Sequence, residues 1–142
     1  MGFSLDHVVL WVEDPLRSLA FFEEVVGLPG VRVAEFRAGA VPFPSVRVSE
    51  GALLDLMARG NAAGADRLAD APGSAGHPVN HVCLAMDAAG FDGLRKRLAD
   101  HGTPASAVSE GSFGARGAAV RSCYFRDPDG NVVEARHYPE RG

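Results

Sequence analysis

Hydrophobic and polar residues alternate along two similar stretches of the chain, LDHVVLWVED at residues 5–14 and VNHVCLAMDA at residues 79–88. Side chains of a β-strand point alternately to its two faces, so this alternation predicts a strand with one buried face. When the two stretches are aligned, His7 matches His81 and the apolar neighbours also match. The pattern therefore predicts an internal repeat in which each half begins with a strand that carries a histidine.

An apolar stripe at helical spacing follows each of these strands. In the first half, Asp14 and Pro15 are the residue types of an N-cap and a first helical position. The stripe itself consists of Leu16, Leu19, Phe22 and Val26. In the second half a helix is predicted over about residues 89–100, ending at His101 and Gly102.

Three strand-like segments follow each predicted helix, so each half is a β-α-β-β-β module. The expected strands are roughly residues 31–36, 45–49 and 52–58 in the first half, and 105–108, 119–126 and 131–138 in the second. The turn DPDGN before the last strand has proline and glycine where a tight turn needs them. Strands and helices mixed in this order predict an α+β fold.

A segment rich in glycine and alanine separates the two modules and is expected to be a flexible linker. We predict a first module over residues 1–58, the linker over 59–78 and a second module over 79–142. The chain has 142 residues, of which 46% are hydrophobic and 23% charged. This length and composition suit one globular domain made of the two halves.

Each half places one histidine and one carboxylate on the same predicted face of its sheet. The histidines are His7 and His81, on the first strands, and the carboxylates are Asp55 and Glu134, on the last strands. The opposite face of all four strands is apolar and should pack against the helix. The histidine and carboxylate side chains should then line the concave side of the sheet.

Two imidazoles and two carboxylates suit a divalent cation such as Zn, Ni, Mn, Co or Fe(II), because two carboxylate charges cancel the two charges of the metal. A cation would also explain Glu134, which lies in the middle of a predicted buried strand, where an unpaired charge is costly. Taken singly, such a histidine is more often a hydrogen-bonded rim residue, and such an aspartate often faces water. Recurrence at matching places favours the metal site.

Charge and composition restrict the partners. The net charge is −4 and the pI is near 5.7, so nothing indicates nucleic-acid binding. The apolar runs are too short to span a membrane, and the N-terminal residues lack the pattern of a signal peptide. We therefore expect a cytoplasmic protein that acts on a small molecule, with Cys83 and Cys123 as buried reduced thiols.

These elements resemble the vicinal oxygen chelate superfamily, which includes glyoxalase I, extradiol dioxygenases, and fosfomycin- and bleomycin-resistance proteins. The resemblance covers nearly the whole chain through LDHVVLWVEDPLRSLAFFEEVVGL, VNHVCLAMD and the most specific piece, YFRDPDGNVVE. It implies two modules whose mixed sheets curve into a cup around a metal ion, with helices outside. It also implies a homodimer, with modules paired within a chain or swapped between chains. The metal positions implied are His7, Asp55, His81 and Glu134.

Departures from the pattern of glyoxalase I bear on the substrate. Trp11 stands where those enzymes often carry an arginine for glutathione, and Arg59 stands where they often carry an asparagine. A glutathione substrate is therefore not expected. Asp55 is shorter than the usual glutamate or glutamine by one methylene, which is roughly 1.5 Å of reach. Without Asp55, the remaining two histidines and Glu134 would form a triad that suits Fe(II) oxygen chemistry.

The resemblance implies a glyoxalase-like lyase or isomerase that acts through a metal-stabilised enediolate on a small oxygen-chelating substrate. Glu134 and Asp55 would move the substrate proton. The alternatives are an extradiol-type dioxygenase acting on a catechol-like substrate, and a non-catalytic protein that binds an antibiotic.

Three further residues are candidates for substrate binding. Trp11 would favour a flat or apolar substrate, although a core position explains it equally well. Arg116 and Arg121 belong to the glycine-rich segment EGSFGARGAAVR, which we interpret as a mobile lid. Their ordinary role is that of solvated surface charges, and the functional one is to hold a carboxylate or phosphonate group of the substrate.

Overall fold

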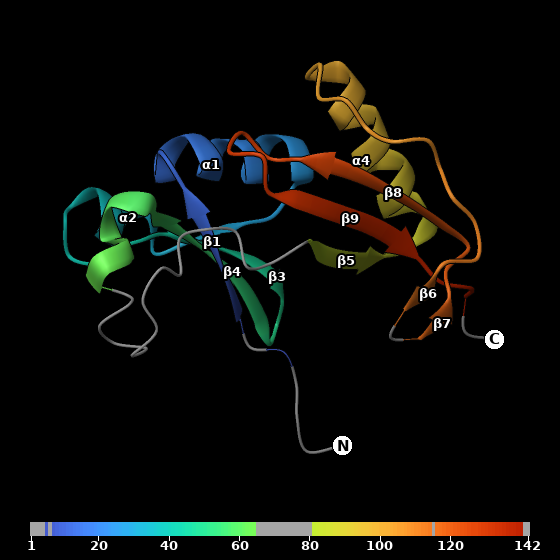
Figure 1. The fold of residues 1–142 in the computed structure, drawn as a ribbon, viewed down its shortest axis with the longest axis horizontal. Coiled ribbons are helices and arrows are strands. Elements are labelled where there is room, and N and C mark those ends of the chain that lie inside the picture. The colour runs from blue at the N-terminus through green and yellow to red at the C-terminus, as the bar shows by residue number, and fades with distance from the viewer. Residues whose placement is uncertain (1–4, 6, 65–80, 115, 141–142) are drawn as a thin grey trace. The chain divides into compact units, whose positions relative to one another are not determined.

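The computed structural model describes residue 5 and residues 7–64, 81–114 and 116–140. The chain divides into two compact units, residues 1–79 and 80–142 (Figure 1). Each unit contains helices and a mixed sheet, which confirms the predicted α+β class. Within the described residues, no helix has both the length and the apolar character needed to cross a membrane.

The first unit has a four-stranded sheet in the order β1-β4-β3-β2. Strand β1 runs parallel to β4, and the other pairs are antiparallel. Its elements are β1 (His7–Val12), α1 (Pro15–Phe21), the π-helix η1 (Phe22–Val26), β2 (Gly30–Val31), α2 (Val33–Arg37), β3 (Ser45–Ser49), β4 (Ala52–Ala58) and the 3₁₀-helix η2 (Arg59–Asn61).

The first predicted helix is present as α1 and η1 in succession. Its N-cap is Asp14, as predicted, and the carboxylate accepts hydrogen bonds from the backbone N–H groups of Leu16 and Arg17 at 3.0 and 3.3 Å. Gly27 ends the helix with a left-handed φ of 89°, a conformation that glycine adopts without a steric penalty. Leu19, Phe22 and Val26 of the predicted stripe are buried, so the helix packs through that face, but Leu16 is exposed, contrary to the prediction.

The prediction of a strand over residues 31–36 is wrong. Only Gly30 and Val31 pair with β3, and the chain then forms the short helix α2. Arg32 turns the backbone between them with a left-handed φ of 60°. Alanine, glutamate and arginine in the following residues are good helix formers, so local preference wins over the apolar pattern here.

The second unit has a three-stranded sheet in the order β5-β9-β8 and a separate two-stranded ribbon, β6-β7. Strand β5 runs parallel to β9, and β8 runs antiparallel to it. Helix α4 packs against β9 (Figure 1). The elements are β5 (Val82–Met86), α4 (Ala88–Asp100), β6 (Phe113–Gly114), β7 (Gly117–Ala118), β8 (Arg121–Arg126) and β9 (Val132–His137).

One strand expected in this unit is absent. Residues 105–108 form no strand, because only isolated bridges join Ala105 to Phe125 and Ser109 to Ser122. The glycine-rich segment interpreted as a mobile lid contains the hairpin β6-β7. Its role as a lid stays a prediction.

The two units repeat one plan, in which the first strand lies parallel to the last and a helix connects it to the rest. The apolar strand face is buried in both, as predicted. Its fully or nearly fully buried residues include Leu10, Val12, Leu54 and Leu56 in the first unit and Leu84, Val133 and Ala135 in the second. The histidine and carboxylate side chains extend from the other face. The expected cup concerns both units together and stays a prediction.

Candidate functional site

In the first unit, parallel pairing of β1 and β4 brings His7 and Asp55 together. The two strands are adjacent with Val9 opposite Asp55, so His7 lies two residues away on the same face. His7 Nε2 is 4.0 Å from Asp55 Oδ2. The imidazole is half exposed, whereas Asp55 is 7% exposed. One nitrogen and one oxygen donor thus lie side by side at the end of the strand pair.

A buried serine holds the other oxygen of Asp55. Ser45 lies opposite Asp55 in the antiparallel pair β3-β4. Its hydroxyl donates a hydrogen bond of 2.6 Å to Asp55 Oδ1. Ser45 is neutral and brings no positive charge to the carboxylate. Its bond to Oδ1 leaves Oδ2 directed to His7.

In the second unit, the equivalent strands bring His81 and Glu134 together. His81 immediately precedes β5, and its neighbour on the same face, Cys83, lies opposite Glu134 in β9. His81 Nε2 is 3.4 Å from Glu134 Oε1. Glu134 is 2% exposed, so its charge needs compensation within the fold.

That compensation comes from Arg136, two residues farther along β9 on the same face. Its Nε and Nη2 atoms donate to Glu134 Oε2 at 3.0 and 2.5 Å. The same guanidinium donates to the Tyr138 hydroxyl at 3.3 Å and to Ser112 Oγ at 3.3 Å. Burial alone would lower the pKa of Arg136, but the hydrogen bonds to Glu134 and Tyr138 raise it. The Arg136 guanidinium therefore compensates the buried charge of Glu134, for which the sequence predicted a metal ion.

Two more side chains border the Glu134 pair. Tyr124 lies opposite Glu134 in the hairpin β8-β9, and its ring stands edge-on to the His81 ring with centroids 5.6 Å apart. Its hydrogen bond to Glu134 raises the pKa of Tyr124, and burial raises it further. Partial desolvation by the surrounding side chains raises the pKa of the Cys83 thiol, and the charge of Glu134 adds to that rise. Cys83 is exposed, contrary to the expectation of a buried thiol, whereas Cys123 is buried as expected.

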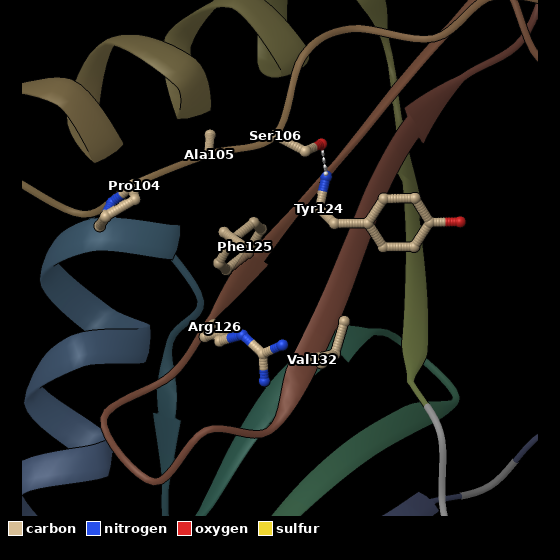
Figure 2. Close-up of a pocket in the computed structure, with 7 residues that line it drawn as sticks. All are labelled: Pro104, Ala105, Ser106, Tyr124, Phe125, Arg126 and Val132. Carbon is tan, nitrogen blue, oxygen red and sulfur yellow. Dashed lines mark hydrogen bonds between the residues drawn. The ribbon is translucent and has the colours of Figure 1, made fainter.

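A cavity of about 390 Å³ adjoins Tyr124 in the second unit, a size typical of small-molecule pockets. Figure 2 shows its lining, in which the ring of Tyr124 points away from Phe125 and the backbone N–H of Tyr124 donates to Ser106 Oγ at 2.8 Å. The residues that line it are Pro104, Ala105, Ser106, Tyr124, Phe125, Arg126 and Val132. The lining is mostly apolar and carries one guanidinium, that of Arg126.

The three predicted substrate-binding residues lie in different surroundings. Trp11 is buried in β1, opposite Met57 of β4. Arg116 is exposed and stacks over the Tyr138 ring at 4.7 Å, beside a smaller cavity of about 200 Å³. Arg121 lies on the helix face of β8, across the sheet from Glu134. There it donates to His137 Nε2 at 2.9 Å and to Asp92 Oδ1 at 2.8 Å.

Both pairs have the donor types that a divalent ion needs, and one of them also has the spacing. Ligands at about 2.0–2.2 Å from such an ion lie roughly 3.0–3.4 Å from one another. The pair of His81 and Glu134, at 3.4 Å, has this spacing, and the pair of His7 and Asp55, at 4.0 Å, is wider. Within the part of the chain that the structure describes, no group of three or more histidine, cysteine, aspartate or glutamate side chains forms a metal site. Each unit thus presents a half-site of one nitrogen and one oxygen.

The chain is similar in sequence to a curated protein and in fold to several solved structures. A curated protein, the glyoxalase domain-containing protein RDO1 of Mycosarcoma maydis, is 28% identical over 141 residues, which are 96% of this chain and 69% of that protein. An integron cassette protein from the mobile metagenome of V. cholerae is 27% identical, with a TM-score of 0.75 over 98% of both chains. The lactoylglutathione lyase of Agrobacterium tumefaciens shares the fold, with a TM-score of 0.68 at 22% identity over 94% of this chain and 92% of that one.

A family match covers the two half-sites and the strands that carry them. Residues 4–135 match the family described as the Glyoxalase/Bleomycin resistance protein/Dioxygenase superfamily. The match includes all four histidine and carboxylate positions and leaves out only the ends of the chain. The chain therefore belongs to the glyoxalase/bleomycin resistance protein/dioxygenase superfamily.

Proposed function

We propose that the protein is a metal-dependent enzyme with glyoxalase-like lyase or isomerase chemistry, acting on a small substrate that chelates through neighbouring oxygens. His7, Asp55, His81 and Glu134 would hold one divalent ion, Zn, Ni, Mn, Co or Fe(II). The observation that carries the proposal is the recurrence of the same histidine–carboxylate pair, at 4.0 and 3.4 Å, at the same place in both units. Superfamily membership supports it.

The residues of the chain have distinct tasks in this proposal. The bound dication would supply Lewis-acid polarisation of a substrate carbonyl. Glu134 Oε1 and Asp55 Oδ2, the oxygens directed to the histidines, would hold the substrate proton or move it between adjacent carbons. Arg136 and Ser45 fix the remaining carboxylate oxygens, so neither carboxylate can rotate without breaking a hydrogen bond. The cavity beside Tyr124 would take the body of the substrate.

The test is metal content together with proton exchange. Protein purified without added metal should contain a divalent ion by elemental analysis, and His81→Ala should lose it. His101→Ala is the matched control, because His101 lies exposed at the C-terminal end of α4, bonded only to its own helix at Arg97. The wild type should also exchange the proton next to the carbonyl of small 2-hydroxyketones with deuterium, observed by NMR. Removal of the metal by a chelator should stop this exchange. Equal metal content in wild type and His81→Ala would sink the proposal.

The dioxygenase alternative has one observation in its favour. The spacing of His7 and Asp55 is the longer of the two, and Ser45 already occupies Oδ1 of that aspartate. If Asp55 is not a ligand, the two histidines and Glu134 make the triad typical of Fe(II) oxygenases. Oxygen uptake by the Fe(II)-loaded protein with a catechol panel would support this function. A metal content of zinc or nickel alone, with no oxygen uptake, would count against it.

A further inference from the structure

Arg136, two residues after Glu134, has no charged counterpart in the first unit, where Met57 follows Asp55 at the same spacing. The arginine side chain is 6% exposed and reaches Glu134 through two N–H groups that both end on Oε2. Oε1 faces His81 Nε2 at 3.4 Å. The guanidinium is itself held by Ser112 and Tyr138, so its place is fixed from two sides.

The first half-site holds its carboxylate with a hydroxyl instead. Ser45 donates to Asp55 Oδ1 at 2.6 Å and brings no charge. The pair of His7 and Asp55 therefore carries one negative charge, whereas Glu134 and Arg136 together carry none. The two half-sites match in donor atoms and differ in charge by one unit.

We propose that Arg136, by cancelling the charge of Glu134, makes the metal site prefer an oxygen ligand that carries one negative charge over a neutral ligand of the same shape. This inference rests on the proposed function. A dication held by two carboxylates alone would be electrically balanced, but the guanidinium leaves one positive charge in excess. An anionic ligand would compensate this excess, and in a partly buried site such compensation is worth far more than in water. Arg136 acts here as a positioning and charge-setting residue, through Glu134.

The test compares two ligands on the Co²⁺-loaded protein. Tropolonate and 2-methoxytropone offer the same pair of neighbouring oxygens on the same ring, but only tropolonate is charged at a pH where tropolone is ionised. Their dissociation constants can be followed through the visible absorption of the bound Co²⁺. The ratio of the two constants isolates the effect of charge, because changes in site shape affect both ligands.

We expect the wild type to prefer tropolonate and Arg136→Met to reduce that preference about tenfold or more. Arg136→Lys keeps the charge and should retain most of the preference. Should Arg136→Met fail to fold by circular dichroism, Ser112→Asp offers the same test, because it places a carboxylate beside the guanidinium and neutralises it. Lys96→Met is the control, since it removes an exposed positive charge from α4.

The outcomes separate this inference from the function on which it rests. Co²⁺ bound by the wild type, with the same ligand ratio in Arg136→Met or Ser112→Asp, overturns the inference and leaves the metal site standing. An Arg136→Lys variant that loses as much preference as Arg136→Met also overturns it, because the charge would then not be the cause. A wild type that binds no Co²⁺ overturns both.

Discussion

Ser45 and Arg136 are the residues that give the two carboxylates their orientation. Each bonds one oxygen of a buried carboxylate and leaves the other facing a histidine. Partners of this kind orient metal ligands and are commonly worth about 10–100-fold in metal affinity. At the scale of single residues, the functional proposal therefore depends on these two as much as on the four donors.

Ser45→Ala should weaken binding of Zn²⁺ about tenfold. The variant loses the 2.6 Å hydrogen bond, which frees Asp55 to rotate, and should also lower the free energy of unfolding by about 1 kcal/mol. Competition with a chromophoric chelator measures the first quantity and urea denaturation the second. Ser18→Ala removes an equally buried hydroxyl from α1 and should leave the Zn²⁺ affinity unchanged. A Zn²⁺ affinity that Ser45→Ala does not alter would contradict the positioning role of Ser45.

Arg121→Met should destabilise the fold and leave metal and ligand affinity unchanged. Arg121 packs over the Phe91 ring at 4.7 Å and donates to the buried His137, a bond worth about 1 kcal/mol. Its hydrogen bond lowers the pKa of Asp92. The stabilisation from that pair is present above the ordinary pKa of 3.8 and is lost as the pH falls through the lowered value.

The free energy of unfolding of Arg121→Met should therefore approach that of the wild type at acid pH, as denaturation at a series of pH values would show. Arg37→Met, which removes an exposed arginine from α2, is the control. Loss of ligand affinity in Arg121→Met, with stability intact, would restore the predicted role of Arg121 in substrate binding.

The two histidine–carboxylate pairs could be predicted from the sequence, but the residues that hydrogen-bond the carboxylates could be predicted only in part. Alternation along a strand suffices to put His7 with Asp55 and His81 with Glu134. Tyr124 could also have been found, because β8 and β9 pair without interruption from their turn and place it opposite Glu134. Ser45 could not, because a bulge between Arg47 and Ser49 shifts the register of β3 by one residue. Counting from the turn would place Val46 opposite Asp55.

At the scale of elements, the turn between β8 and β9 fixes the register that positions Glu134. Asp127 is buried at its start, where Oδ1 accepts from the backbone N–H groups of Asp129 and Asn131 at 3.0 and 2.8 Å. Burial raises the pKa of Asp127, although these hydrogen bonds partly oppose the rise. Gly130 completes the turn with a left-handed φ of 81°. The sequence DPDGN therefore predicts the turn, because its aspartate and glycine meet local backbone requirements.

Gly130→Ala should lower the free energy of unfolding by about 1 kcal/mol, because alanine at a left-handed φ is strained even though no atom crowds the new methyl group. Gly51→Ala is the matched control. Gly51 also has open space around it, but an ordinary φ, so alanine there should be neutral or slightly stabilising. Thermal unfolding of both variants gives the comparison. Equal melting temperatures for the two would show that the turn imposes no conformational demand.

The short elements α2, β6 and β7 could not be predicted from the sequence. Helix α2 has five residues and buries none of them, so the sequence has no apolar stripe that would predict it. The hairpin β6-β7 has two residues in each strand and is rich in glycine, which resembles an unstructured loop in composition. Elements of this length depend on their surroundings, whereas α1 and α4 carry caps and buried faces of their own.

At the scale of the whole molecule, the chain consists of two units that each offer half of a ligand set. A single His–carboxylate pair binds a divalent ion weakly, since most protein sites supply three or four ligands. If the proposed metal site exists, strong binding would need donors from both units, either of one chain or of two chains in a dimer.

We expect one metal ion per chain, and no ion in either His7→Ala or His81→Ala. Elemental analysis after dialysis measures this ratio. Two ions per wild-type chain, or one ion retained in each variant, would show that the half-sites act separately. Mixing the two variants under refolding conditions adds a second test. Recovery of metal binding requires that a first unit of one chain combines with a second unit of another, because only that pairing reunites both intact histidines.

The two units have the same donor atoms but hold their carboxylates differently, one with the hydroxyl of Ser45 and one with the guanidinium of Arg136. A protein assembled from two first halves would balance the charge of a bound dication with two carboxylates and would gain nothing from a charged ligand. A protein assembled from two second halves would pair each glutamate with an arginine. A bound dication would then keep both its positive charges and would attract anions strongly. The chain itself has one unit of each kind, so a bound dication would keep a single positive charge, an intermediate value that two identical units could not give.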